Sequence, residues 1–308
     1  MTKAIIFIVL IIIAATAAGI AVRKIMKGKK KAARNAILVF IALVGFTGIN
    51  FIGGYMIAPV FFLKDSPDEA AHKAVEGLDS VTKISVDGRY GNMSGWLMES
   101  GEENAPLVVY FGGNKECSAL RMKYLSEDRY GEVFDGFDFV CVDYPGYCES
   151  EGVAGSKSFK QYGLEVYDFV TKDREPESVY IMGYSIGTGV ANYVAANREC
   201  DGLILFAPYG DGSDLYNTVC NIFHGPLKLL VGFNMDSDKF AEDIAVKPLI
   251  LAAGEDEVIP WKCAERLSKC YREGSDFVLI EGIGHSNIWT DEKALELVKD
   301  YLHADSAN

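Results

Sequence analysis

Residues 178–197 read SVYIMGYSIGTGVANYVAAN, and this stretch decides the fold class. It contains Gly183-Tyr184-Ser185-Ile186-Gly187, a match to G-x-S-x-G that chance alone could supply in a Gly-rich chain. Its setting is more informative, because a buried-strand pattern precedes the motif and a helical pattern follows it, as a nucleophile elbow requires. The two glycines permit a tight turn that presents the serine hydroxyl at a helix N-terminus. Ser185 is therefore the predicted nucleophile, and the N–H of Ile186 is the predicted first donor of an oxyanion hole.

Outward from this stretch, short apolar runs alternate with helical patterns. The predicted strands are Lys83–Val86, Met93–Met98, Leu107–Phe111, Phe137–Asp143, Val179–Gly183, Leu203–Ala207, Pro248–Ala253 and Phe277–Glu281. The predicted helices are Cys117–Tyr130, Phe159–Lys172, Ile186–Asn197, Trp261–Arg272 and Asp291–Leu302. Continuous apolar runs fit strands covered on both faces, and the alternation indicates an α/β class. We expect a mostly parallel eight-stranded sheet flanked by helices over residues 81–308.

One long connection interrupts this alternation. Residues 209–246 separate the sixth and seventh predicted strands and carry FHGPLKLLVGF at their centre. A connection of this length is usually a lid or a binding element. Its apolar centre fits a surface for acyl chains or for a bilayer, and it fits ordinary packing helices equally well.

A serine nucleophile needs a base, and the base needs an orienting acid. His285 follows the last predicted strand in a Gly-flanked loop, where ligands gather in open α/β sheets. The other histidines lie in a linker, in the insertion and near the C-terminus: His72, His224 and His303. The chain order Ser…Asp…His favours His285 as the base.

The predicted acid follows the seventh strand. Asp256 lies in the loop of residues 254–260 and is the preferred candidate, with Glu255 or Glu257 as alternatives if the register differs. The second oxyanion donor is expected from the loop after the third strand, residues 110–114, where paired glycines let a backbone amide point into the site. The N–H of Asn114 is the predicted donor.

Two long apolar runs occupy the N-terminal quarter. Residues 4–22 carry no charge, and residues 36–63 contain Asn50 as their only strongly polar side chain, so each is long enough to span a bilayer. Residues 23–35 between them carry seven positive charges and no acid, as cytoplasmic loops do. We predict a two-helix transmembrane hairpin, a linker over residues 65–80 and an extracytoplasmic catalytic domain. A cleaved signal peptide is the alternative for the first run, and the cysteines fit a reducing compartment slightly better.

Charge and cysteine content argue against several classes of protein. All 43 Asp and Glu lie in residues 65–308, where 21 Lys and Arg oppose them, so binding to nucleic acid is not expected. The seven cysteines include no C-x2-C pair and no histidine at metal-ligand spacing, so no zinc site is expected. Their odd number argues against a full disulfide framework, and we expect most of them to be thiols that are buried or have no chemical role. With no G-x-G-x-x-G and no P-loop, no nucleotide or flavin cofactor is expected either.

Five motifs in this order resemble the α/β-hydrolase superfamily: FGGN at 111–114, DYPGYCESEG at 143–152, GYSIG at 183–187, EDEVIP at 255–260 and GH at 284–285. The sequence looks most like the branch of membrane-associated serine hydrolases that includes lysophospholipase-like enzymes and protein depalmitoylases, with serine aminopeptidases among its relatives. The resemblance covers about residues 81–302. It implies Ser185 as nucleophile, Asp256 as acid and His285 as base, with the amides of Ile186 and Asn114 as the oxyanion hole.

The sequence departs from the family pattern in two loops. The family often has His-Gly-Asn where this chain has Gly112-Gly113-Asn114, so any role of that histidine is absent. Pro145 and Cys148 replace Arg and Gly in a loop that often reads Asp-Tyr-Arg-Gly-Tyr-Gly. Asp143, at the start of that loop, is interpreted as structural, because the acid position after the seventh strand is filled.

Together these patterns predict a membrane-anchored serine hydrolase that cleaves ester or thioester bonds through an acyl-enzyme on Ser185. The expected substrate is a small or lipid-like acyl compound close to the bilayer. A peptidase or amidase with the same triad is the first alternative, and a catalytically idle, membrane-anchored binding module is the second. Acyl length, leaving group and oligomeric state are left open.

Overall fold

The computed structural model describes residues 16, 18–25, 27–51, 62, 67–126, 128–172 and 174–304. The chain divides into two units. One unit comprises Met1–Val60 with Phe223–Gly232, and the other comprises Phe61–Ile222 with Phe233–Asn308. The second unit contains the whole sheet and is called the catalytic domain below.

The first unit contains helix α2, Lys30–Phe51, and the turn η2, Gly225–Leu230. Among the described residues, no helix combines the length and the apolar character needed to cross a bilayer. The predicted span 4–22 lies mostly outside the described residues, and the predicted span 36–63 coincides with α2 only up to Phe51. Both spans therefore stay predictions.

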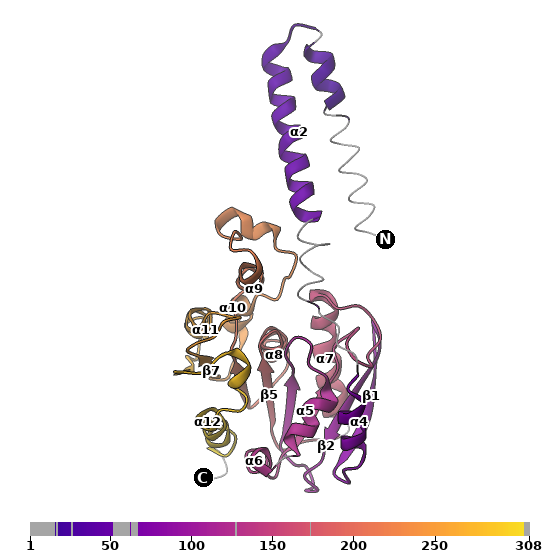
Figure 1. The fold of residues 1–308 in the computed structure, drawn as a ribbon, viewed down its shortest axis with the longest axis vertical. Coiled ribbons are helices and arrows are strands. Elements are labelled where there is room, and N and C mark those ends of the chain that lie inside the picture. Colours follow the sequence, from indigo (N-terminus) through magenta and orange to yellow (C-terminus); the bar gives the residue numbers. More distant parts are fainter. Residues whose placement is uncertain are drawn as a thin grey trace. The chain divides into compact units, whose positions relative to one another are not determined.

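Eight strands form one mixed sheet in the order β1-β2-β4-β3-β5-β6-β7-β8 (Figure 1). Their bounds are β1 Val81–Gly88, β2 Gly91–Met98, β3 Leu107–Phe111, β4 Asp138–Val142, β5 Val179–Tyr184, β6 Gly202–Phe206, β7 Leu249–Ala253 and β8 Asp276–Ile280. The pairs β1–β2 and β2–β4 are antiparallel, and every other pair is parallel. The predicted eight-stranded, mostly parallel sheet is confirmed.

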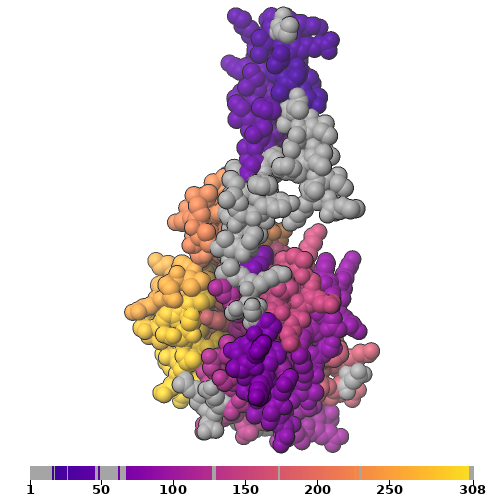
Figure 2. Space-filling view, turned by 45° about the vertical axis from the view of Figure 1, so that its right-hand side comes forward, coloured from indigo at the N-terminus to yellow at the C-terminus, as the bar shows by residue number. Residues whose placement is uncertain are grey.

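Burial along the strands explains their composition. Strands β3, β6 and β7 are buried at every residue, which is why they read as continuous apolar runs. Strand β1 lies at an edge and is buried only at Val81 and Val86, with its other residues exposed or half-buried. The two edges of the sheet lie on different sides of the catalytic domain, the purple β1–β2 hairpin on one and the yellow C-terminal segment on the other (Figure 2).

Helices cover both faces of the sheet. Residues of α4, α5 and α12 share one core with the strands, whereas α7 and α8 pack against each other and against β1, β3, β5 and β6. The bounds are α4 Glu69–Glu76, α5 Ser118–Leu125, α6 Asp128–Gly131, α7 Ser156–Lys172, α8 Gly187–Ala195, α9 Gly212–Val219, α10 Ser237–Phe240, α11 Trp261–Ser268 and α12 Glu292–Leu302. Two short 3-10 turns complete the domain, η3 Ala241–Asp243 and η4 His285–Asn287.

Two features differ from the expectations. Residues 65–80, predicted as a linker, contain helix α4, whose N-cap Asp68 accepts a hydrogen bond from the N–H of Ala71 at 2.9 Å. Cys117 and Cys148, expected to be unpaired thiols, form a disulfide. The five other cysteines are free, so the prediction that no full disulfide framework exists agrees with the structure.

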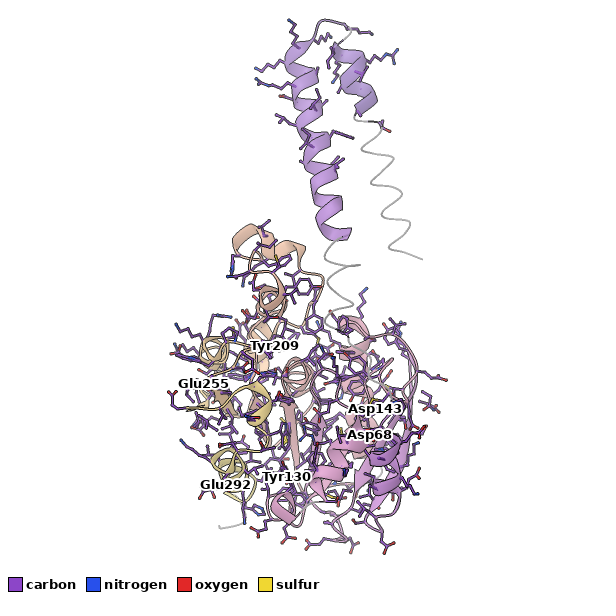
Figure 3. The ribbon with its side chains drawn as sticks, viewed as in Figure 1. Asp68, Tyr130, Asp143, Tyr209, Glu255 and Glu292 are labelled. Carbon is purple, nitrogen blue, oxygen red and sulfur yellow. A yellow bond between two sulfur atoms is a disulfide. The ribbon has the colours of Figure 1, made fainter. Side chains whose placement is uncertain are left out.

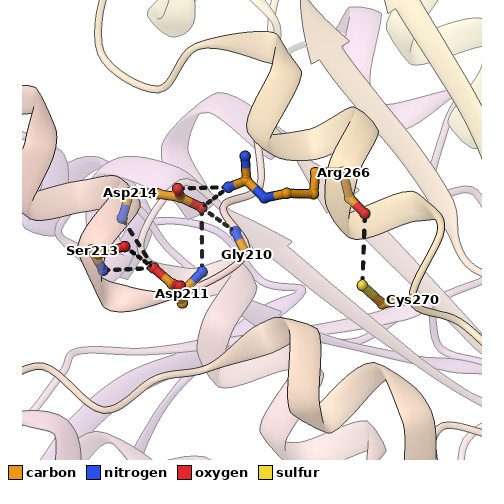
Figure 4. Close-up of polar contacts among 6 residues, drawn as sticks. All are labelled: Gly210, Asp211, Ser213, Asp214, Arg266 and Cys270. Atoms are coloured by element: carbon orange, nitrogen blue, oxygen red, sulfur yellow. Dashed lines mark hydrogen bonds and ion pairs between the residues drawn. The ribbon is translucent and has the colours of Figure 1, made fainter. Parts of the chain in front are cut away.

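The insertion between β6 and β7 is tied to the domain at its base. The carboxylate of Asp214, on α9, accepts hydrogen bonds from the N–H of Gly210 at 2.8 Å and from the guanidinium of Arg266 at 2.6 Å (Figure 4). Asp211 caps α9 by accepting from the N–H of Ser213 at 2.8 Å. These bonds link the start of the insertion to helix α11.

Candidate active site

Ser185 lies at the sharp turn between β5 and α8. Its φ of 53° is in the left-handed region, which a non-glycine residue adopts only where its surroundings hold it there. Its N–H donates to the carbonyl of Phe206 on the neighbouring strand at 2.9 Å, and its carbonyl accepts from the hydroxyl of Thr188 at 2.7 Å. These bonds present the hydroxyl at the end of the sheet where the carboxyl ends of the parallel strands meet.

The glycines of the motif leave no room for side chains. A Cβ at Gly187 would collide with the carbonyl oxygen of Phe111 and lie 2.5 Å from that of Gly112. A Cβ at Gly183 would lie 2.8 Å from the Cα of Thr188. The elbow therefore packs directly on the end of β3, which brings the loop after β3 close to the serine.

The structure brings the three predicted triad residues together. Nε2 of His285 lies 2.9 Å from Oγ of Ser185, and its Nδ1 lies 2.7 Å from Oδ2 of Asp256. His285 begins η4 after β8, and Asp256 follows β7, so both side chains come from neighbouring strand ends. With Nδ1 donating to the carboxylate, Nε2 is left to accept the proton of the serine hydroxyl.

The loop after β7 fixes the position of Asp256. Its Oδ1 accepts from the N–H groups of Val258 at 2.8 Å and Ile259 at 2.6 Å. Glu255, one of the alternative acids, is exposed. Glu257, the other alternative, accepts from the backbone N–H of His285 at 3.1 Å, and the pKa of its exposed carboxyl is lowered by its own backbone N–H and by that of His285.

The two predicted oxyanion donors are unengaged within the part of the chain that the structure describes. The N–H of Ile186 precedes the first residue of α8, and no backbone or side-chain acceptor within that part receives it. The N–H of Asn114 likewise has no protein acceptor there, whereas the N–H of the preceding Gly113 donates to Oε2 of Glu116 at 2.7 Å. Both free donors lie close to the elbow in the chain. Ile186 directly follows Ser185, and Asn114 lies two residues after Gly112, whose carbonyl oxygen packs against Gly187.

Asp143 lies apart from the triad. Its carboxylate accepts from the N–H of Ser118 at 2.7 Å, at the start of α5. Figure 3 places Asp143 toward the β1–β2 side of the domain and Glu255, the neighbour of Asp256, toward the β7 side. Burial raises the pKa of Asp143 to about 6. This geometry fits the structural role expected for Asp143.

Several supporting residues have no counterpart in the sequence-based predictions. Glu116 pairs with Arg121 through Nε at 2.5 Å, and the hydroxyl of Tyr110 donates to the same carboxylate at 3.0 Å. Tyr184 donates to the carbonyl of His285 at 3.2 Å, with its ring 5.3 Å from the imidazole. The role of Tyr184 could have been predicted from the sequence, since it lies inside the elbow motif. The spacing of Glu116 and Arg121 matches no known motif, so their roles could not.

Potential metal ligands cluster at one place among the described residues: Cys117, Asp143 and Cys148. The two sulfur atoms are bonded to each other, so this group does not offer two thiolates to a metal ion. The site is built from a hydroxyl, an imidazole, a carboxylate and backbone amides, which together suffice for acyl transfer.

Comparison with solved structures places the fold. The chain aligns with an esterase from Pyrococcus furiosus at a TM-score of 0.61, with 12% identity over 78% of this chain and 96% of the esterase. It aligns with Est1E from Butyrivibrio proteoclasticus at a TM-score of 0.57, with 17% identity over 73% of this chain and 99% of Est1E. The profile of the family described as serine aminopeptidase, S33, matches residues 133–231, which include the elbow. The catalytic domain thus has the α/β-hydrolase fold.

The chain is also similar in sequence to proteins of two kinds. Protein MT2364 of Mycobacterium tuberculosis is 23% identical over 82% of this chain and 88% of its own length. The lysophosphatidylserine lipase ABHD12 of Mus musculus is 30% identical over 56% of this chain, and the match covers 47% of the lipase. The chain thus spans about half the length of the mouse lipase that it resembles.

Proposed function

We propose that this α/β-hydrolase cleaves carboxylic esters or thioesters by forming an acyl-enzyme on Ser185. The observation that carries the proposal is the contact of Nε2 of His285 with Oγ of Ser185 at 2.9 Å, while Asp256 holds Nδ1 at 2.7 Å. In this arrangement the imidazole removes the proton from the serine as the hydroxyl attacks a carbonyl carbon.

The remaining steps follow from the same atoms. Attack by Oγ of Ser185 breaks the carbonyl π bond, and the resulting oxyanion accepts hydrogen bonds from the N–H groups of Ile186 and Asn114. The imidazolium of His285 then donates its proton to the leaving alcohol or thiol as the bond to the carbonyl carbon breaks. A water molecule, deprotonated by His285, attacks the acyl-enzyme, and the proton returns to Ser185 when the carboxylic acid leaves.

A lipid-like acyl substrate is the proposed class. It is supported by the similarity to lysophosphatidylserine lipases, whose own substrate is a lipid. The exposed apolar side chains of Val219 and Ile222 in the insertion also support it, because they suit contact with an acyl chain or a lipid surface. The ferulic acid complex of Est1E indicates that this fold also accommodates an aromatic acid.

The decisive experiment removes the nucleophile. Ser185→Ala should lower kcat for p-nitrophenyl esters by at least about 10⁴-fold, because triad members act as a unit. The variant should also lose labelling by a fluorophosphonate probe while keeping its thermal stability. Turnover and labelling that survive the substitution would contradict the proposal, and an unlabelled wild-type protein would favour an idle binding module.

An amidase or peptidase is the second candidate, because the matching family profile is described as serine aminopeptidase. A panel of aminoacyl p-nitroanilides against p-nitrophenyl esters of two to sixteen carbons separates the two. We expect kcat/KM for the best ester to exceed that for the best anilide. The opposite order would assign the chain to the amidases.

We also propose that residues 4–22 and 36–63 anchor the chain in a membrane with the catalytic domain on the extracytoplasmic side. The basic loop 23–35 supports this topology, and so does the Cys117–Cys148 disulfide, since disulfides persist in oxidising compartments. An impermeant maleimide should label the exposed Cys220 on intact cells, and Cys220→Ser should reduce the label. Labelling that appears only after permeabilisation would place the domain in the cytoplasm.

A further inference from the structure

Glu116 occupies the space beneath the loop that carries the second oxyanion donor. Its Oε2 accepts from the N–H of Gly113 at 2.7 Å, and the N–H of Glu116 returns to the carbonyl of Gly113 at 3.4 Å. These two bonds close the turn of residues 113–116. Lys115 within the turn has a φ of 65°, in the left-handed region, so the turn adopts a backbone conformation that these bonds help to maintain.

The glycines of the loop are packed between two side chains. A Cβ at Gly112 would lie 3.1 Å from Cδ of Glu116, and a Cβ at Gly113 would lie 2.8 Å from the ring of Tyr184. The carboxylate of Glu116 therefore fills the volume that a side chain at position 112 would need. In this chain the loop is supported by an acid from the following turn.

The acid is itself held by a buried cation. The side chains of Glu116 and Arg121 are 12% and 9% exposed, and Nε of Arg121 lies 2.5 Å from Oε1. The guanidinium lies over the ring of Trp289 at 4.0 Å and over that of Tyr110 at 5.1 Å. Burial lowers the pKa of Arg121, but the charge of Glu116 and the hydrogen bond to it raise this pKa, and the net effect keeps the guanidinium protonated. A buried pair with this many fixed partners has little freedom to move.

We propose that Glu116 is a positioning residue for the oxyanion hole. By binding the N–H of Gly113, it removes that amide from the set of possible donors and turns the next amide, that of Asn114, toward the site. Tyr147 holds the other end of the same loop, since its hydroxyl donates to Oδ1 of Asn114 at 2.7 Å. This inference rests on the proposed ester hydrolysis and adds to it the group that orients the second donor.

A matched pair of double variants isolates the contact with Gly113. Glu116→Gln with Arg121→Met and Glu116→Leu with Arg121→Met both remove the ion pair, and neither leaves a buried charge unpaired. Gln keeps a carbonyl oxygen that can accept from the N–H of Gly113, whereas Leu has nearly the same shape and no acceptor. The two variants differ in two hydrogen bonds, the one from Gly113 under test and the one from the hydroxyl of Tyr110, and adding Tyr110→Phe to both variants removes the second difference.

Full-length protein is assayed with p-nitrophenyl butyrate and with butylboronic acid, whose tetrahedral adduct on serine places an oxygen in the oxyanion hole. The Gln variant should keep kcat within about 3-fold of wild type, and the Leu variant should lose about 10- to 100-fold in kcat with KM changed less than about 3-fold. The Ki of the boronic acid should rise in parallel with the loss of kcat/KM. A residue that only stabilises the fold would change the melting temperature and leave Ki unchanged.

Asp138→Asn is the control for loss of a loop-holding carboxylate. Asp138 accepts from the N–H of Ser100 at 2.9 Å, lies 3.9 Å from Arg174 and has a side chain 14% exposed, but it stands at the opposite end of the sheet. We expect its kcat and Ki to match wild type.

If the Leu variant does not fold, Glu116→Asp replaces it. The shorter acid keeps the charge beside Arg121 and withdraws from Gly113, so this variant should lose about 5- to 50-fold in kcat.

The two proposals fail in different ways. If Ser185→Ala keeps its turnover, ester hydrolysis by this site is wrong. If Ser185→Ala is inactive and the Leu and Gln variants have equal kcat and equal Ki for the boronic acid, the site is correct and the role of Glu116 is wrong.

Discussion

Asp256 offers its two carboxylate oxygens to different partners, and only one of them faces His285. Oδ2 lies 2.7 Å from Nδ1 of the imidazole, while Oδ1 accepts from the N–H groups of Val258 and Ile259. Because two backbone donors fix Oδ1, the carboxylate does not rotate to exchange its oxygens. This asymmetry determines which proton the imidazole carries.

Asp256→Asn should therefore abolish most activity without disturbing the site. The amide oxygen is expected to take the place of Oδ1 and keep the two backbone bonds, which leaves the NH₂ group facing Nδ1 of His285. That contact stabilises the tautomer protonated at Nε2, which does not accept the serine proton, so kcat should fall by on the order of 10⁴-fold. Steady-state kinetics with p-nitrophenyl butyrate measures the loss. Glu255→Gln, at the exposed neighbouring position, should stay within about 2-fold of wild type, and the reverse ranking would make Glu255 the acid.

Asp143 should make the stability of the protein depend on pH. Burial raises its pKa from 3.8 to about 6, so between these values the folded state keeps a proton that the unfolded state has released. The free energy of unfolding then decreases as the pH rises from about 4 to about 6, by on the order of 3 kcal/mol from this group, and is constant above that range.

Asp143→Asn should remove this dependence and keep an oxygen for the N–H of Ser118. Urea denaturation of wild type and variant at pH 4.5, 5.5 and 7.0 gives the comparison. The variant should gain stability over wild type as the pH rises, and parallel curves for the two proteins would contradict the assignment. Glu99→Gln, at an exposed site, serves as the control for loss of a negative charge.

The Cys117–Cys148 disulfide should contribute measurably to stability. It closes a loop with a sequence separation of 31, for which the chain-entropy estimate is about 3–4 kcal/mol. Thermal denaturation with and without a phosphine reductant should show a lower melting temperature for the reduced wild type. The double variant Cys117→Ser with Cys148→Ser should melt at the lower temperature and be insensitive to reductant. Equal sensitivity of both proteins would assign the effect to another pair of cysteines.

Gly187→Ala should be among the most damaging small substitutions in the elbow. The added methyl group collides with the carbonyl oxygens of Phe111 and Gly112, so β3 or α8 must shift. We expect a loss of at least about 1–3 kcal/mol in the free energy of unfolding, measured by chemical denaturation. Gly131→Ala is the control, since a Cβ there meets no atom within 4 Å, and its change should stay within about 0.5 kcal/mol. Equal stability of the two variants would show that the elbow tolerates a shift of the strand.

The sheet was largely predictable because its central strands are buried on both faces. Burial demands an apolar residue at every position, so β3 and β7 appear in the sequence as uninterrupted apolar runs bounded by Gly, Pro or charged residues. The three triad residues were predictable for a related reason. The topology brings the carboxyl ends of parallel strands to one edge, and each of these residues lies in the loop that follows such an end.

The supporting contacts were not predictable, because they join residues through space without a repeating pattern. Glu116 and Arg121 are five residues apart, which is not the spacing of an ion pair on a helix, and the fold places the guanidinium over the ring of Trp289, far along the chain. Helix α4 is only two turns long, and its buried Ala71 and Val75 give too short a periodic pattern to detect. The pairing of Cys117 with Cys148 depends on the packing of two loops, which spacing does not specify.

Both ends of the insertion meet at one glycine of α8. A Cβ at Gly189 would collide with the hydroxyl of Tyr209 and lie 3.2 Å from Cβ of Met235. The two ends are also joined by a hydrogen bond, which the N–H of Asp238 donates to the carbonyl of Gly210 at 2.9 Å. The entropy of closing a loop grows slowly with its length, so a loop with pinned ends tolerates large changes between them. We expect the stretch beyond the Asp214–Arg266 bond, residues 219–232, to tolerate exchange while Ser185 keeps its surroundings. Chimeras with these boundaries should change substrate preference more than kcat.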